Sequence, residues 1–320
     1  MKTSLLWIAI VLGGITACVS SGVTSAEEYF SIGMAYFDLE QYENAEKWLE
    51  RARGVDKTKL ASEYNLGRIA YETGRFDEAV RYFDRVLARD ADNVLALKAA
   101  AYARIKIGDL AAAESLYDRV LELEPENTDQ GYNYALVLMA MDKSEEAEAV
   151  LLNYKITMAD NKDTLLLLAR VQKALHKVEA ADAYSQWLED NKDTAVQYEY
   201  AQVLESFQFY ARALEEYRAL IDALPAAAGD GPDRAELRFS AARLLLIADS
   251  EKEDGVTEME TAVSEGFKDT EKLTALLAEP NISAAHKDDI RRIIADLEKK
   301  AEPDQADQAE QDSDTVSESP

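Results

Sequence analysis

Two consecutive segments of 34 residues decide the fold. They read LASEYNLGRIAYETGRFDEAVRYFDRVLARDADN (residues 60–93) and VLALKAAAYARIKIGDLAAAESLYDRVLELEPEN (residues 94–127). When the two are aligned, Gly67 falls on Ala101, Ala79 falls on Ala113, and a glycine stands near the middle of each segment. Antiparallel helices approach closely only where both carry small side chains. Each segment therefore predicts a helical hairpin whose turn lies at the central glycine.

The same period extends along the chain in both directions. Small residues recur in the second helix of each hairpin at Ala45, Ala79, Ala113, Ala147, Ala181 and Ala213. They recur in the first helix at Gly33, Gly67, Ala101, Ala135, Ala169 and Ala201. Each step is 34 residues except the last, which is 32, and the six units occupy residues 26–225. A generic helical bundle has no reason to keep one period, so this spacing favours a repeat array.

The pattern resembles the tetratricopeptide repeat, which is a helical hairpin of the same length. Leu66-Gly67 matches the Leu-Gly of the family pattern, Ala79 and Phe83 match its A-x3-F, and Pro125 matches its closing proline. The resemblance implies an all-α fold. This would be a right-handed superhelical solenoid of antiparallel helix hairpins, with a concave groove lined by the first helices.

The chain beyond the repeats divides by composition. Residues 226–232 are expected to be a flexible break rich in Ala and Gly. Residues 233–299 regain helical periodicity and are expected to cap the last repeat, and a diverged seventh repeat is one interpretation of them. Ser283 is expected to be the N-cap of the final helix. Residues 300–320 form an acidic tail that is expected to be disordered.

The start of the chain has the character of a signal peptide over residues 1–17. It ends in Ile15-Thr16-Ala17-Cys18, which resembles the lipobox of bacterial lipoproteins, and Cys18 is the only cysteine in the sequence. The resemblance implies a fatty-acid anchor on Cys18, a short linker over residues 18–25, and an envelope protein that faces the periplasm. Inner and outer membrane are both open. The alternative is an ordinary secretory signal beside a chance cysteine.

The composition argues against several classes of function. Acidic residues number 62 and basic residues 35, giving a net charge of −27 without a basic stripe, which argues against nucleic acid. The two histidines, His176 and His286, are far apart, and no His/Cys cluster or phosphate-binding glycine loop is present. The acids of Asp249 to Glu260 are spaced as in a calcium loop, but Gly255 comes one place late. The sequence therefore predicts no catalytic residue, no metal site and no cofactor.

The family resemblance also implies which side chains face the groove. Carried over by position in the repeat, they are Phe30, Met34, Phe37, Arg68, Lys98, Tyr102, Lys106, Arg170 and Lys173. Aromatic side chains with scattered cations suit an extended peptide or helix that carries carboxylates. The alternative is that the cations only offset the acidic surface around them. The two-carboxylate clamp of chaperone-binding repeats is not predicted, because only Lys98 and Asn133 fit its pattern.

These observations lead to two hypotheses of different classes. The first is a membrane-anchored, non-enzymatic scaffold that binds a partner protein or peptide in its groove, in envelope assembly or transport. The second is a periplasmic small-molecule-binding protein that uses an aromatic pocket in the groove. An open trough would favour the first hypothesis and an enclosed pocket the second.

Overall fold

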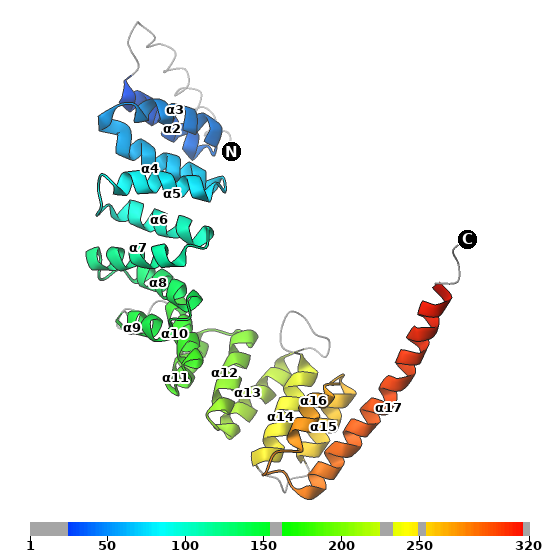
Figure 1. The fold of residues 1–320 in the computed structure, drawn as a ribbon. Coiled ribbons are helices and arrows are strands. Elements are labelled where there is room, and N and C mark those ends of the chain that lie inside the picture. The colour runs from blue at the N-terminus through cyan, green and yellow to red at the C-terminus, as the bar shows by residue number, and fades with distance from the viewer. Residues whose placement is uncertain (1–24, 154–161, 225–232, 249–253, 316–320) are drawn as a thin grey trace, which may run out of the picture. The chain divides into compact units, whose positions relative to one another are not determined.

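The structure is a computed structural model that describes residues 25–153, 162–224, 233–248 and 254–315 (Figure 1). Within these ranges the regular elements are α-helices, and no strand occurs. The chain divides into two compact units, residues 1–154 and 155–320. The predicted signal peptide, Cys18 and the break at residues 226–232 lie outside the described residues.

The first unit is a run of four helical hairpins (Figure 1). Its helices are α2 (Ala26–Asp38), α3 (Tyr42–Arg53), α4 (Asp56–Glu72), α5 (Phe76–Leu87), α6 (Val94–Lys106), α7 (Leu110–Leu123), α8 (Thr128–Ala140) and α9 (Ser144–Asn153). Each helix packs against the next one along the chain. Repeats 1 to 4 of the sequence analysis correspond to these four hairpins.

The second unit begins with two further hairpins and ends with four helices of the cap. Its helices are α10 (Lys162–Ala174), α11 (Glu179–Asp190), α12 (Thr194–Ser206), α13 (Tyr210–Ala223), α14 (Arg234–Ala248), α15 (Asp254–Ser264), α16 (Thr270–Leu276) and α17 (Ala284–Thr315). Helices α14 and α15 pack on each other as a hairpin, and α14 packs on α13. Leu237 and Leu244 of α14 share one core cluster with α12 and α13, so this hairpin extends the array as a seventh unit would.

The small residues that define the period are all buried. The six second-helix alanines are between 0% and 2% exposed, and the first-helix positions are buried as well. Gly67 shows why these positions must be small. A Cβ atom there would lie 2.6 Å from Cε1 of Phe83, whose ring is 1% exposed. The spacing in the sequence therefore records the contact between the two helices of each hairpin.

The turn inside each hairpin repeats with the same period. One residue per turn has a left-handed backbone, with φ between 52° and 79°: Glu40, Gly74, Gly108, Asp142, His176 and Gln208. The residue after it donates its N–H to the carbonyl five positions back at 2.7–2.9 Å, as in a Schellman motif. The fifth repeat has Ser185 where an aromatic residue is usual, and the left-handed His176 confirms its register.

Helix starts recur in the same way. Asn93 and Asn127 stand one period apart before α6 and α8, and the side chain of each accepts a hydrogen bond from the N–H three residues on, at 3.1 Å and 3.2 Å. Asp193 caps α12 similarly, accepting from Val196 at 3.1 Å. These caps satisfy N–H groups that a helix cannot pair internally. Polar residues between the predicted repeats therefore cap the first helices of the third, fourth and sixth hairpins, whereas α4 begins after Val55 without a side-chain cap.

Four of the six left-handed turn residues are not glycine, and this gives a stability prediction. A left-handed backbone costs a residue with a Cβ roughly 1–2 kcal/mol, a cost that glycine avoids. Gln208 is exposed, so Gln208→Gly should raise the free energy of unfolding by about 0.5–1 kcal/mol in urea titrations. Glu215→Gly, at an exposed position inside α13, should lower it by about 1 kcal/mol. A lower stability for Gln208→Gly would contradict the strain argument.

The cap agrees with the sequence in one respect and differs in three. Ser283 caps α17 as predicted, with its Oγ accepting from the His286 N–H at 3.2 Å. The short helix α16 was not foreseen. Helix α17 continues as far as Thr315, so the expectation of a disordered tail over residues 300–320 is wrong for most of its length. That expectation considered only whether the tail could bury apolar surface, whereas Ala, Glu and Gln favour helix on their own.

The third difference concerns Gly255, the glycine of the calcium-loop pattern. It lies in α15, together with Glu258 and Glu260, and not in a loop. A Cβ on Gly255 would lie 2.8 Å from Cγ of Leu246 in α14. Gly255 therefore permits the close approach of α14 and α15.

Candidate functional site

A hollow in the first unit combines aromatic walls with one cation. It has a volume of about 340 Å³ and is formed by α4, α5 and α6. Its lining residues, called the aromatic hollow below, are Tyr64, Arg68, Tyr71, Glu72, Phe83, Ala99 and Tyr102. Of the nine predicted groove residues, only Arg68 and Tyr102 line it.

The helical period brings the α4 side chains of the hollow together. Tyr64, Arg68, Tyr71 and Glu72 are spaced four, seven and eight positions from the first, which is one face of a helix. Phe83 of α5 is almost fully buried, and its ring centroid lies 5.8 Å from that of Tyr64. Tyr102 of α6 is 37% exposed. The result is an apolar interior that is open to solvent at a polar edge.

Arg68 is held in place without being neutralised. Its guanidinium carbon lies 4.4 Å from the ring centroid of Phe37 on α2, and its Nη1 donates to Oδ1 of Asn65 at 3.1 Å. Among the residues that the structure describes, no carboxylate lies within ion-pair distance of it. A guanidinium has five N–H donors, so Arg68 keeps donors for a further acceptor.

The hydroxyl of Tyr102 is a second polar group at the hollow. It accepts a hydrogen bond from Nδ2 of Asn133 at 2.7 Å. The ring of Tyr102 meets that of the buried Tyr117 edge-on, with centroids 6.2 Å apart. Burial raises the pKa of Tyr117, and burial followed by the charge of Glu72 raises the pKa of Tyr71. These two phenols therefore stay protonated at neutral pH.

The three predicted groove residues of α2 have different places. Phe30, Met34 and Phe37 are partly buried and pack against the core cluster of the first unit. Phe37 also contacts Arg68, so it supports the hollow from behind. The aromatic residues of α2 therefore belong mainly to the core, and only Phe37 contacts a residue of the hollow.

The other predicted cations of the first unit do not line the hollow. Lys98 pairs with Oε2 of Glu124 at 2.7 Å, and this hydrogen bond lowers the pKa of the Glu124 carboxyl. Lys106 is exposed and borders a different depression, beside Arg75 and Arg81. Of the predicted cations of the first unit, only Arg68 lines the hollow.

Arg170 and Lys173 belong to the second unit. Arg170 makes two hydrogen bonds to Glu199, at 2.9 Å and 3.0 Å, and Glu199 also accepts from Tyr184 at 2.7 Å. Burial works to raise the pKa of Glu199, but the hydrogen bonds from Arg170 and Tyr184 outweigh it and lower that pKa. Lys173 donates to Oε1 of Gln202 at 3.2 Å. Arg170 is therefore already neutralised within its own unit.

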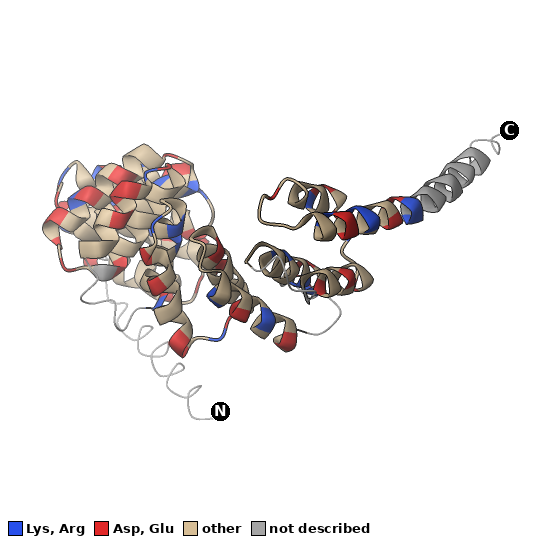
Figure 2. Ribbon diagram, turned by 90° about the horizontal axis from the view of Figure 1, so that it is seen from below, with Lys and Arg blue, Asp and Glu red and all other residues tan. Residues whose placement is uncertain are grey.

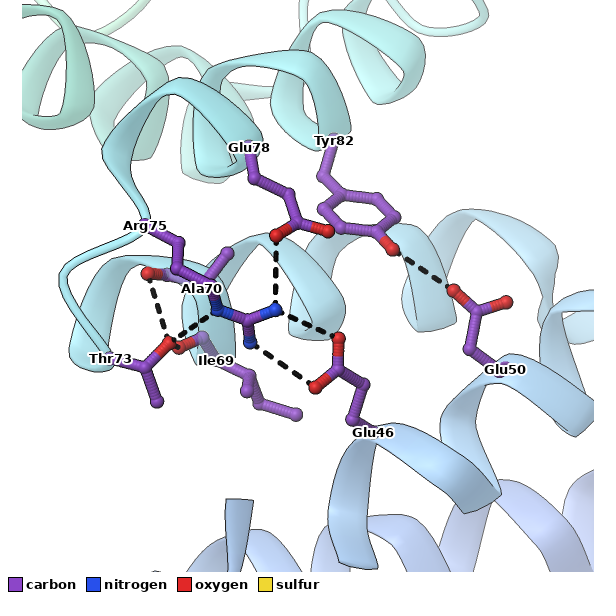
Figure 3. Close-up of polar contacts among 8 residues, drawn as sticks. All are labelled: Glu46, Glu50, Ile69, Ala70, Thr73, Arg75, Glu78 and Tyr82. Atoms are coloured by element: carbon purple, nitrogen blue, oxygen red, sulfur yellow. Dashed lines mark hydrogen bonds and ion pairs between the residues drawn. The ribbon is translucent and has the colours of Figure 1, made fainter. Parts of the chain in front are cut away.

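A polar network between repeats 1 and 2 escaped the sequence analysis (Figure 3). Arg75, just before α5, donates to both oxygens of Glu46 on α3 at 3.1 Å and 3.2 Å and to Glu78 at 3.0 Å. Tyr82 donates to Glu50 at 2.9 Å, and burial together with this bond raises the pKa of Tyr82 to about 12. These hydrogen bonds link α3 of repeat 1 to α5 of repeat 2 and to the residue that precedes α5.

The network had a signal in the sequence. Lys143 and Glu114 pair at 2.6 Å, with the same separation of 29 residues as Arg75 and Glu46, two repeats further on. Comparing charges at equal repeat positions would have found both pairs. Acidic and basic residues are interspersed along the helices of each unit (Figure 2).

Comparison with known proteins agrees with this architecture. Residues 64–128 match a family model described as tetratricopeptide repeat, and residues 25–92 match a second model of the same description. A tetratricopeptide repeat protein from Parabacteroides merdae has a similar solved structure, with a TM-score of 0.52, 20% identity, and coverage of 79% of this chain and 98% of that one. The chain therefore contains tetratricopeptide repeats, and its described residues have the fold of a tetratricopeptide repeat solenoid.

Two further proteins are similar to parts of this chain. An uncharacterized lipoprotein of Treponema pallidum is 29% identical over 160 residues, which is 50% of this chain and 82% of that protein. The structure of YrrB, described as a tetratricopeptide repeat protein with an unusual peptide-binding site, matches with a TM-score of 0.50 and 17% identity over 60% of this chain and 96% of that one. At such identities the solved structures establish the fold.

Proposed function

We propose that the chain is a lipid-anchored, non-enzymatic scaffold of the cell envelope that binds a partner protein through the aromatic hollow. The observation that carries the proposal is Arg68, a cation fixed against Phe37 and without a described carboxylate partner. The ligand that suits it is a carboxylate on an extended segment of the partner, either an acidic side chain or a chain terminus.

The geometry of the hollow supports this chemistry. A guanidinium can donate two parallel hydrogen bonds to a carboxylate. Hydrogen bonds to a charged group contribute about 1.5–3 kcal/mol each. The rings of Tyr64, Tyr71 and Phe83 offer an apolar surface to the side chain beside the carboxylate. One residue of the partner would thus be recognised by its carboxylate charge, and the adjacent partner residue by the shape of its side chain.

The openness of the hollow separates the two functional hypotheses. Pockets for small molecules bury most of the ligand surface. Here Tyr102 is 37% exposed and Glu72 is exposed, so the hollow is a trough with solvent along its edge. A trough suits side chains presented by an extended partner better than a free small molecule. The peptide-binding site named for YrrB supports the same choice.

The anchor belongs to the proposal as well. The lipobox-like stretch before Cys18 and the similarity to a lipoprotein both support lipidation at that cysteine. No helix among the described residues is long and apolar enough to span a membrane. Between Cys18 and the first helix there are seven residues, which extend over at most about 25 Å. The repeats would then work close to the membrane, facing the periplasm, in envelope assembly or transport.

Partner capture tests the binding proposal. Protein purified from envelope extract should bring a partner with it, which mass spectrometry identifies, and Arg68→Glu should lose that partner. Recovery of the same partner in the same amount with Arg68→Glu would place the binding surface elsewhere.

Lipidation gives a separate prediction. The wild-type chain should incorporate labelled palmitate and sediment with membranes, because acyl chains on Cys18 partition into the bilayer. Cys18→Ala should lose the label and move to the soluble fraction, whereas Cys18→Ala that still carries label would show that the anchor is elsewhere. Capture of the partner in detergent extract should not depend on this change, which keeps the two tests independent.

A further inference from the structure

The second unit has a cleft of its own. Its volume is about 480 Å³, and it is formed by α12, α13, α14, α16 and the turn after α16. The lining residues used below define the cap cleft: Tyr198, Glu205, Tyr217, Glu236, Phe239, Arg243, Lys272 and Glu279. The sequence analysis did not foresee this cleft, because α16 was not predicted.

Both cations of the cap cleft are neutralised inside it. Arg243 forms an ion pair with Glu205, which also accepts a hydrogen bond from Tyr217 at 3.0 Å. Lys272 on α16 pairs with Glu236 on α14 at 2.5 Å, and this bond raises the pKa of the lysine. Each of the two cations is therefore matched by a carboxylate of the same lining.

One carboxylate is left over. Glu279 lines the cleft, is only partly buried, and forms no ion pair with any residue that the structure describes. The charged residues of the lining are three acids and two bases, so the cleft has one negative charge in excess. The aromatic hollow, by comparison, is lined by one base and one acid, Arg68 and Glu72.

Aromatic side chains complete the cap cleft. The rings of Tyr198 and Tyr217 lie with centroids 6.2 Å apart. Phe239 is 4% exposed, and its ring stacks on that of Phe267 with centroids 4.2 Å apart. Phe239 is therefore a fixed part of the cleft lining. Aromatic faces attract cations and also accept the alkyl stems of lysine and arginine. A carboxylate beside such rings is the combination that an ammonium or guanidinium on an alkyl stem needs.

We propose that the cap cleft binds an alkylammonium or guanidinium group, with Glu279 as its counter-ion and Tyr198 against its stem. The group can come from a lysine or arginine of a partner protein or from a free polyamine. The inference does not depend on the function proposed for the first unit.

Ligand-detected NMR titration on the full-length chain tests this inference. The probes are acetyl-Ala-Lys-Ala-amide, cadaverine as the free amine, and acetyl-Ala-Glu-Ala-amide as the acidic counterpart. We expect the lysine peptide to bind and the acidic peptide not to bind. Cadaverine binding as tightly as the peptide would identify a free polyamine as the source, and binding of the peptide alone would identify a protein partner; either supports the proposal.

Variants assign the binding to the cleft. Glu279→Gln should weaken the lysine peptide about three- to tenfold, as loss of a partly buried ion pair does. Glu271→Gln, at an exposed position of α16, should leave the affinity unchanged. Thermal melting by circular dichroism verifies that both variants fold. Equal affinity in wild type and Glu279→Gln, no binding of the lysine peptide, or preference for the acidic peptide would overturn the proposal.

Discussion

Ala113→Leu should lower the free energy of unfolding of the first unit by about 1–3 kcal/mol, through overpacking. Ala113 is 0% exposed at the fourth position of α7, and the alanines of α6 that pack on this helix are equally buried. A leucine there must push α6 and α7 apart or adopt a strained rotamer. Thermal melting followed by circular dichroism at 222 nm measures the loss.

The same helix offers a matched control. Ala111 stands two positions earlier in α7 and is exposed, so Ala111→Leu makes the same chemical change without meeting the facing helix. Its stability should remain within about 0.5 kcal/mol of wild type. If both variants melt like the wild type, the register assigned to the repeats is incorrect.

The fold could be predicted because its determinants are local and periodic. The buried small residues, exemplified by Gly67 against Phe83, appear in the sequence at a constant spacing. The left-handed turn residues repeat with the same period, but only Gly74 and Gly108 are glycines, the residue type that predicts such a backbone from the sequence. His176 takes the same left-handed backbone without being glycine, because the packing of the hairpin imposes it. The repeat period therefore predicted the positions of the hairpin turns better than the type of residue at each turn did.

The candidate site was predicted only in part, because a cation's partner is not a periodic property. Arg68 and Lys98 both have long basic side chains on first helices, yet Lys98 reaches Glu124 at 2.7 Å while Arg68 rests on Phe37. Whether such a cation is neutralised depends on acidic residues of other helices. These residues are not among the repeat positions used to predict the groove. Arg170 shows the same limit, since Glu199 lies 29 residues away in the sequence.

The cap was harder still. Residues 233–299 lack the complete repeat signature, and α16 is a single short helix that begins behind an Asp269 cap. Its side chain accepts from the Lys272 N–H at 2.9 Å, which is a local signal that a search for long periodic helices passes over. The cap cleft follows from that helix and was therefore invisible to the sequence analysis.

The largest functional effect is expected for Arg68→Glu. The change replaces a guanidinium that can hold a carboxylate with a carboxylate that repels it, and binding energy at such sites is concentrated in a few anchors. We expect affinity for the captured partner to fall at least about thirtyfold, equivalent to about 2 kcal/mol. The loss of the contact with Phe37 should cost stability only about 0.5–1 kcal/mol. Arg68→Lys keeps the charge but not the paired donors and should be intermediate.

The most direct test is the affinity of the captured partner for wild type, Arg68→Glu and Arg89→Glu, measured at low and high salt. Arg89 is exposed, follows α5 and has no ion pair among the described residues, so its reversal changes net charge equally without touching the hollow. The account predicts that Arg89→Glu binds like wild type, that Arg68→Glu does not, and that salt weakens wild-type binding because it screens charges over about 8 Å at physiological ionic strength. Equal affinity of Arg68→Glu and Arg89→Glu for the partner would contradict it.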